Sequence, residues 1–329
     1  MSENTPKYGI VIAAYNAEQT LQRAVDSVRK QTVDDWQLII VDDGSIDSTY
    51  QIASQFAQID ERIIVVSQRN QGSATARNNG IERLETEWIS YLDADDELDP
   101  RYLNYLQSFI AKHSAFDVYA VGLIRLDPDG WEEAIWKNSR PVVLSIEKVL
   151  SGFSVSLGAA LMRKAFFVQQ GGFRTEIRYG EDYDFILRAL ADGASIVRVP
   201  KNLLRYDCSI IGRKSDQEEK RAAANLEIIS DLETRDGLTA SQKEVIDRAL
   251  TIGTARLERA SLSPDARESS PSTEHEIMKQ EVISLRASLL KIFPIPIVKA
   301  ILYILHKVAW LVRPVRRRNA QRKLNAMGE

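Results

Sequence analysis

The sequence predicts an α/β fold in which helices flank a mixed β-sheet, followed by a helical extension. Short runs rich in β-branched residues alternate with amphipathic segments from residue 8 onward. These runs are apolar almost throughout, which is typical of parallel strands buried on both faces. The chain has 329 residues, 44% of them hydrophobic, and this composition can supply a sizeable core.

The first hundred residues predict strands and helices in strict alternation. The expected strands are 8–14, 36–43, 62–68 and 88–94, and the expected helices are 18–31, 49–59 and 74–84. In the first of these helices the apolar residues fall on one face, as they do in a helix that covers a sheet. Strands joined by helices in this order are expected to pair in parallel.

Beyond residue 100 the pattern indicates antiparallel additions to the sheet. The expected elements are a helix at 100–113, a strand at 118–126 that returns through "DPDG" and "WEEAIW" as a hairpin, helices at 160–173 and 180–193, and a strand at 195–200. Gly171, Gly172 and Gly193 are expected to stop the two later helices. A hairpin beside parallel strands makes the sheet mixed.

We expect four parts along the chain. They are an α/β domain over 1–212, a helical extension over 213–263, a polar linker over 264–280 and a basic amphipathic helix over 281–329. Ser241 and Glu244 have the spacing of a capping box at the start of the second extension helix. The linker, rich in Ser, Pro and charged residues, has the composition of a flexible tether.

The C-terminal part has a strong excess of basic over acidic residues. The whole chain has a formal net charge of −3, yet from residue 285 onward there are ten Lys or Arg and a single acidic residue, Glu329. A basic helix with one apolar face is expected to lie on an anionic membrane surface. Two alternatives stay open: a helix docked on this protein or on a second copy, and a helix that spans the membrane. Nucleic acid is not expected as a partner, because no recognition motif accompanies the charge.

Cysteine content and the N-terminal sequence bear on location. The chain contains one cysteine, Cys208, which excludes an internal disulfide and fits a reducing compartment. The N-terminal residues do not resemble a signal peptide. We therefore expect a cytoplasmic protein, peripheral at the inner face of the cell membrane. The sequence leaves the oligomeric state open.

Polar motifs follow or precede the expected strands at four places. They are "AAYNAE" after the first strand, "DDGSIDS" after the second, "GSATARNNG" before the fourth and "DADD" after it. Each has an ordinary structural interpretation, as a turn, a helix cap or a helix end. Ligands of open α/β sheets nevertheless bind outside the carboxyl ends of parallel strands, which is where these motifs fall.

Together, in this order, the motifs resemble glycosyltransferase family 2, whose members have the GT-A fold, over about residues 6–212. The resemblance implies a nucleotide-sugar donor, with uridine or thymidine diphosphate, bound by Ala13, Tyr15, Glu18, Asp43, Arg77 and Asp93. Asp43 falls on the family's nucleobase contact, and a carboxylate facing the imide N–H of uracil is chemically sensible. Ala13 and Ala14 replace the family's usual Pro-Ser or Pro-Thr.

"LDADD" resembles the family's Asp-x-Asp motif, with Asp93 and Asp95 as its two aspartates. Carboxylate oxygens suit a hard divalent cation, so Mg²⁺ or Mn²⁺ is the expected cofactor. Such a cation would neutralise charge on the departing nucleoside diphosphate. Asp96, Glu97 and Asp99 are expected to be turn and helix-cap residues and not ligands.

"GGF" followed by "EDYDFILR" resembles the family's second motif, in which the aspartate is the catalytic base. Asp182 is therefore the expected base, and Glu181 is expected to position the base or the acceptor. The alternative is that both only complement a helix dipole. The resemblance implies a single displacement with inversion at the anomeric carbon. The family's usual Tyr-Arg and His near the last strand are absent; Arg205, Arg213 and Lys214 are the available substitutes.

The sequence thus predicts a metal-dependent inverting glycosyltransferase. Its expected acceptor is a glycan or a lipid-linked molecule in the synthesis of a cell-surface polysaccharide or glycoconjugate. Two alternatives are a sugar-nucleotide pyrophosphorylase and a non-catalytic sugar-nucleotide-binding protein. The first would need a Gly-rich triphosphate loop near the N-terminus, which "AAYNAEQT" does not provide.

Overall fold

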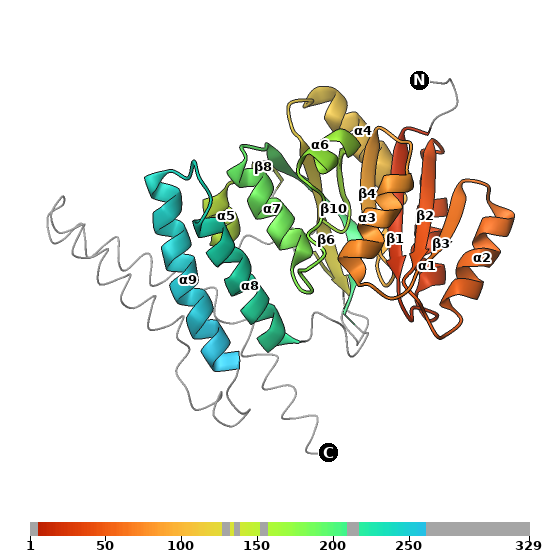
Figure 1. Ribbon diagram of the computed structural model, residues 1–329. Helices are drawn as coiled ribbons and strands as arrows, with labels where there is room; N and C mark the ends of the chain where they lie inside the picture. The colour runs from red at the N-terminus through yellow and green to blue at the C-terminus, as the bar shows by residue number, and fades with distance from the viewer. Residues whose placement is uncertain (1–5, 127–131, 135–138, 152–156, 209–216, 261–329) are drawn as a thin grey trace, which may run out of the picture. The chain divides into compact units, whose positions relative to one another are not determined.

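A ten-stranded mixed sheet is the framework of the computed structural model, which describes residues 6–126, 132–134, 139–151, 157–208 and 217–260 (Figure 1). The strand order is β3-β2-β1-β4-β9-β6-β10-β5, with β7 paired to β6 and β8 to β10. The strands are β1 (Tyr8–Ala14), β2 (Trp36–Asp42), β3 (Ile63–Ser67), β4 (Trp88–Asp93), β5 (Glu97–Leu98), β6 (Val118–Leu126), β7 (Glu132–Ala134), β8 (Val142–Val143), β9 (Ala160–Arg163) and β10 (Ile196–Asp207). The helices are α1 (Leu21–Arg29), α2 (Thr49–Ile59), α3 (Ser73–Arg83), α4 (Tyr102–Lys112), α5 (Ile146–Leu150), α6 (Lys164–Gln169), α7 (Glu181–Ala191), α8 (Glu218–Glu233) and α9 (Ala240–Ala260).

The predicted parallel half is confirmed, because β3, β2, β1 and β4 pair in parallel. Successive side chains of a strand point to opposite faces of the sheet, and both faces here are covered. Ile10 and Ile12 belong to the hydrophobic core cluster that includes the apolar face of α1, whereas Val11 belongs to the cluster that includes α3. Because the residues that point to either face of these strands are buried, the strands appear in the sequence as continuous apolar runs.

The segment 160–173 differs from its prediction as one continuous helix. Its first four residues form β9, which lies between β4 and β6 and is antiparallel to both. Only Lys164–Gln169 is helical, and it ends at Gly171 and Gly172, which both have positive φ. Periodicity misled the prediction because the first three residues of this four-residue strand are all apolar and buried, so no alternation reveals its twofold repeat.

The helical extension and the sheet belong to one compact unit, and that unit covers residues 1–261. Ile228, Ile229 and Leu232 of α8 are buried in the core cluster that contains Phe185 of α7. The expected boundary at residue 212 therefore does not separate two compact units. The two helices were predicted correctly as elements, and Figure 1 shows α8 beside α7 and α9 beside α8.

The capping box of α9 lies two residues before the predicted one. The backbone N–H of Thr239 donates to Oε1 of Gln242 at 2.8 Å, and the N–H of Gln242 donates to Oγ1 of Thr239 at 3.2 Å. Thr239 and Gln242 thus form the reciprocal pair that was assigned to Ser241 and Glu244. Both pairs have the same spacing, so the sequence pattern alone did not distinguish them.

The predicted linker and basic helix, 264–280 and 281–329, lie outside the described residues. Within the part of the chain that the structure describes, no helix has both the length and the apolar character needed to cross a membrane.

Candidate active site

The carboxyl ends of β1, β2 and β4 form the edge of the sheet where the predicted site residues gather. Ala13 of β1 is in register with Val41 of β2 on one side and with Asp93 of β4 on the other. Asp43 follows β2 directly, and its N–H donates to the carbonyl of Ala14 at 2.8 Å. Parallel pairing therefore brings three motifs, separated by tens of residues in the sequence, to one edge.

The loops after β1 and β2 are joined to each other by hydrogen bonds. Asn16 has a positive φ of 49°; its N–H donates to Oγ of Ser45 and its side-chain oxygen accepts from the N–H of Ile46, both at 3.0 Å. Glu18, predicted to bind substrate, accepts from the N–H of Ser48 at 3.0 Å. Glu18 thus holds the two loops together, while Tyr15 beside it is 51% exposed.

Asp43 is 3% exposed, and three N–H groups of the segment after β3 hold its carboxylate. Nε2 of Gln68 and the backbone N–H of Gln71 donate to Oδ1 at 2.7 and 2.9 Å, and the N–H of Gly72 donates to Oδ2 at 2.8 Å. A carboxylate offers about four lone-pair sites. Asp43 can therefore accept one further hydrogen bond through Oδ2 while it fixes the loop that leads into α3.

Helix α3 presents three consecutive polar residues to three different parts of the site. Arg77 pairs with Asp93 at the end of β4 and with Glu181 at the start of α7, and Asn79 donates to the side chain of Gln68. Asn78 binds the backbone of Phe173 twice, through N–H donation at 2.7 Å and acceptance at 3.1 Å. Sequence reasoning identified Arg77 but missed the roles of Asn78 and Asn79, which lie next to it in "ARNNG".

Arg77 is a buried cation between two carboxylates. Its guanidinium lies 2.5 Å from Oδ1 of Asp93 and 2.7 Å from Oε1 of Glu181, and its side chain is 9% exposed. Its carbon Cζ is also 4.4 Å from the ring centroid of Tyr91, within cation–π range. Burial alone lowers the pKa of Arg77, but Asp93, Tyr91 and Glu181 outweigh it and the pKa is raised above its usual value.

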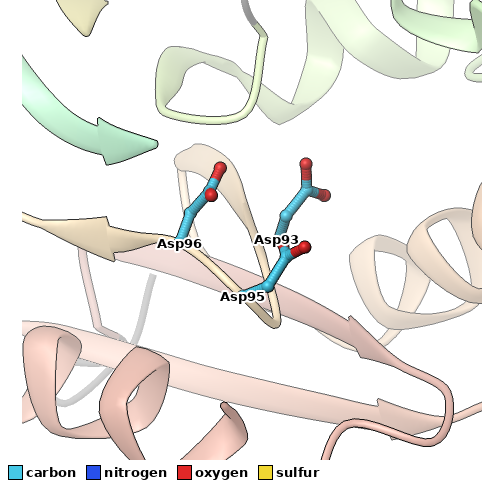
Figure 2. Close-up of side chains that lie close together, drawn as sticks. All are labelled: Asp93, Asp95 and Asp96. Atoms are coloured by element: carbon cyan, nitrogen blue, oxygen red, sulfur yellow. The ribbon is translucent and has the colours of Figure 1, made fainter. Parts of the chain in front are cut away.

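Three aspartates stand close together where β4 ends, Asp93 as its last residue and Asp95 and Asp96 on the turn that leads to β5, as Figure 2 shows. Asp93, Asp95 and Asp96 each have a carboxylate oxygen within 4.8 Å of the others. Carboxylates this close repel one another unless a cation or a proton lies among them, and an all-oxygen set suits Mg²⁺ or Mn²⁺. The donor set therefore fits the predicted cation.

Asp96 has two roles in this turn, of which the sequence predicted one. Its N–H donates to the carbonyl of Asp93 at 3.1 Å, which closes the turn as expected. Its carboxylate, however, belongs to the cluster that could hold a metal, although Asp96 was expected not to be a ligand. Its Oδ1 also accepts from the N–H of Asp207 at 3.3 Å, so Asp96 ties the turn to β10.

The predicted base, Asp182, and its predicted positioning residue, Glu181, begin helix α7. Gly180, with φ 79°, precedes Glu181, which is 6% exposed and accepts from Oγ of Ser73 at 2.6 Å as well as from Arg77. Asp182 is half-buried, and burial together with the negative charge of Glu181 raises its pKa to about 6. A carboxyl with this pKa is deprotonated at neutral pH and still basic enough to accept a proton.

A second group of ion pairs holds the "GGF" loop, α7 and α8 together. Asp184 is 1% exposed; Nη2 of Arg174 lies 2.7 Å from its Oδ1, and Nε of Arg188 lies 2.8 Å from its Oδ2. Arg188 also donates to the carbonyls of Gln170 and Gly172 at 2.6 and 2.7 Å. Arg174 reaches Asp231 of α8 at 2.9 Å. These contacts fix the position of the helix that carries Asp182.

The end of β10 departs from the family pattern in a way that the structure explains. Asp207, which stands where the family usually has an arginine, is 3% exposed and accepts from Nη2 of Arg23 at 2.5 Å. Arg205 pairs with Glu132 of β7 at 2.5 Å. Arg213 and Lys214 lie outside the described residues. The aspartate in this chain therefore anchors α1 to the last strand.

Comparison with known proteins agrees with this geometry. Residues 9–168 match the family model described as "Glycosyl transferase family 2". EpsH of Bacillus subtilis (strain 168), which carries a glycosyltransferase name, is 41% identical over 98 residues, which are 30% of this chain and 28% of EpsH. A protein of Mycobacterium bovis (strain BCG / Pasteur 1173P2) named "PGL/p-HBAD biosynthesis glycosyltransferase" is 29% identical over 59% of this chain and 73% of its own length.

Solved structures share the fold. The crystal structure of S. aureus TarS 1–349 has a TM-score of 0.59 at 20% identity and covers 85% of this chain and 79% of that chain. The same protein in complex with UDP-GlcNAc has a TM-score of 0.61, also at 20% identity, and covers 76% of this chain and 72% of that chain. The matched residues, the mixed sheet and the motifs at its carboxyl edge identify residues 9–168 as a glycosyltransferase family 2 domain, with the GT-A fold.

Proposed function

We propose that this protein transfers a sugar from a nucleotide-sugar donor to a glycan or lipid-linked acceptor, with a divalent metal and with inversion. The observation that supports this most is the pairing of Arg77 with both Asp93 and Glu181. It connects the end of β4, where the donor is expected to bind, to the start of α7. There the carboxyl group of Asp182 has a pKa that suits a general base. Both halves of a transferase site are thereby held at one place.

On the donor side, the residues bind and orient. Oδ2 of Asp43 has one acceptor position left for the imide N–H of uracil or thymine, and Tyr15, exposed on the loop after β1, offers a ring that suits stacking on a base. Asp93, Asp95 and Asp96 would hold Mg²⁺ or Mn²⁺. When bound, that cation would offset the negative charge of the diphosphate. A UDP or dTDP donor fits these groups, and the UDP-GlcNAc complex of TarS supports a donor of this class.

On the acceptor side, Asp182 is the proposed base. Its carboxylate takes the proton of the acceptor hydroxyl as the hydroxyl oxygen attacks the anomeric carbon. The bond from that carbon to the diphosphate oxygen breaks in the same step, so the configuration inverts and the nucleoside diphosphate leaves. Glu181, fixed by Ser73 and Arg77, orients the base. The names of the relatives support an acceptor in cell-surface glycoconjugate synthesis.

Donor turnover is the direct test. Release of UDP or dTDP from a panel of UDP- and dTDP-sugars would be measured with Mg²⁺, with Mn²⁺ and with EDTA, in the presence of a membrane-lipid extract as acceptor source. We expect release that depends on the metal and rises with the extract. Absence of release from every donor contradicts the transferase proposal, and equal rates in EDTA contradict the metal.

The basic C-terminal segment, 281–329, motivates a second part of the proposal. We place the protein at the inner face of the cell membrane, held by electrostatic attraction of this segment to anionic lipid. Flotation of the full chain with anionic vesicles is the expected result, and replacing Arg316, Arg317 and Arg318 by Glu should weaken it. Equal flotation with neutral vesicles would contradict the electrostatic part.

A further inference from the structure

A chain of four polar side chains runs from the outer end of α3 to the predicted nucleobase contact. Nη1 of Arg83 donates to Oδ1 of Asn79 at 3.2 Å and to its carbonyl at 2.8 Å. Nδ2 of Asn79 donates to Oε1 of Gln68. Nε2 of Gln68 then donates to Oδ1 of Asp43 at 2.7 Å. Gln68 and Asn79 are both half-buried, so water competes weakly for these bonds.

The direction of every bond in this chain is fixed at both ends. A guanidinium can only donate, and an ionised carboxylate can only accept. Arg83 therefore requires the oxygen of Asn79 on its side, which turns the amide nitrogen of Asn79 toward Gln68. Gln68 must then direct its oxygen to Asn79 and its nitrogen to Asp43. Arg83 at one end and Asp43 at the other each fix the orientation of the amide next to them. Both require the same orientation of the Asn79 and Gln68 side chains.

This orientation keeps Asp43 an acceptor with one open position. Gln68 and the N–H of Gln71 occupy Oδ1, and the N–H of Gly72 takes one side of Oδ2. The remaining acceptor position on Oδ2 suits a ring N–H. Uracil and thymine carry an N–H at position 3 of the ring, whereas cytosine carries a lone pair there, which would face a second acceptor.

We propose that Gln68, held by Asn79, increases the selectivity of the nucleotide site for uracil or thymine over cytosine. It acts through Asp43 as a positioning residue. This rests on the proposed function, because it assumes that Asp43 faces the donor's nucleobase. It adds that selectivity comes from the fixed direction of the hydrogen bonds between Arg83, Asn79, Gln68 and Asp43 as well as from Asp43 itself.

Binding of UDP and CDP to the full chain, measured by calorimetry with Mg²⁺, tests the proposal. Gln68→Met removes the amide at similar volume, and we expect the UDP-to-CDP affinity ratio to fall about tenfold, the loss of roughly one charge-assisted hydrogen bond. Gln68→Glu sets a carboxylate against Asp43, so the pair shares a proton and the ratio falls further. Gln58→Glu, an exposed glutamine of α2, is the control and should keep the wild-type ratio.

Asn79→Asp tests the chain at a residue one step removed from Asp43. The new carboxylate still accepts from Arg83 but offers Gln68 no N–H, so the oxygen of Gln68 faces a carboxylate in either orientation of its amide. The amide then has no single preferred direction, and its N–H bond to Asp43 is made only part of the time. We expect the UDP-to-CDP affinity ratio to fall about tenfold here as well. In the double variant, Gln68→Met with Asn79→Asp, the ratio should fall no further than in Gln68→Met alone. A merely structural defect would weaken both nucleotides equally.

The outcomes separate this inference from the proposed function. If wild-type protein prefers UDP and all three variants keep its ratio within about twofold, well below the effect expected for a lost hydrogen bond, the role of Gln68 is wrong and the proposed function stands. If wild-type protein binds neither UDP nor dTDP, the donor assignment fails and the inference fails with it. Thermal unfolding of each variant checks that the protein is folded.

Discussion

The donor and acceptor sides of the site are built in different ways. On the donor side, the loops after β1 and β2 are joined by neutral or single-charge hydrogen bonds, such as those of Asn16 with Ser45 and Ile46. On the acceptor side, α7 is held by ion pairs of Asp184 with Arg174 and Arg188. Strand pairing already aligns the donor loops, whereas a helix outside the sheet needs its own anchors. Arg77 joins the two sides.

The largest expected effect is on the acceptor side, from Asp182→Asn. An amide cannot accept the hydroxyl proton, so sugar transfer should fall about 10²- to 10⁴-fold. UDP binding should be unchanged, because Asp43 and its partners are on the donor side. Glu176→Gln, an exposed carboxylate before α7, is the control. Transfer at the wild-type rate in Asp182→Asn would show that another group is the base.

Arg77→Met breaks the connection between the two sides. It leaves Asp93 and Glu181 without their shared cation, and we expect the free energy of unfolding to fall by about 3 kcal/mol, as when one partner of a buried ion pair is removed. Arg163→Met removes an exposed pair with Glu87 and should cost less than about 1 kcal/mol. Chemical denaturation measures both. Equal losses would contradict the central role of Arg77.

Gly80→Ala tests how closely α3 must approach the sheet on the donor side. A Cβ at Gly80 would lie 2.5 Å from Cγ1 of Val11 and 3.1 Å from Cγ2 of Val41. Overpacking of this kind typically costs about 1–3 kcal/mol of unfolding free energy. Because α3 also orients Arg77, we expect transfer activity to fall in the folded fraction. Unchanged stability would show that α3 can move outward freely.

The pH dependence of transfer should report the acceptor side alone. Burial and Glu181 raise the pKa of Asp182 to about 6, with Asp93 adding to the rise and Arg77 opposing it. The active form is deprotonated, so the rate is full above this pKa and falls about tenfold per pH unit below it. UDP binding should show no such step near pH 6. A rate that stays level down to pH 5 would contradict the assignment.

The smallest expected effect on stability is from the exposed ion pair between Arg174 and Asp231 of α8. Asp231→Asn removes an ion pair between Arg174 and a carboxylate whose side chain is 52% exposed, so it should cost less than about 1 kcal/mol. Asp184→Asn, with a side chain that is 2% exposed, is its buried counterpart and should lower the melting temperature far more. Similar shifts for both would mean that α8 supports α7 more than the burial of Asp184 suggests.

Sequence reasoning predicted the placement of residues at the ends of the parallel strands better than the order of the sheet beyond residue 100. Asp43 and Asp93 lie at the ends of strands that apolar runs reveal, so their gathering followed from parallel pairing, whereas Arg77 reaches Asp93 from within α3. The strand β9 was taken for helix, because its position between β4 and β6 depends on partners distant in the sequence. Gln68 lies outside the sequence motifs, and Ser73, although inside "GSATARNNG", had no expected role. The roles of both appear only from which atoms they face.

The three neighbouring residues at 77, 78 and 79 also limit how this protein can change in length. Successive helix residues point about 100° apart, which lets Arg77, Asn78 and Asn79 reach three separate partners. A single residue inserted earlier in α3 would rotate all three away from those partners at once. Loops elsewhere tolerate insertion at little cost. Length variation among functional variants should therefore spare the helix from Ser73 to Arg83 and collect in the connections around it.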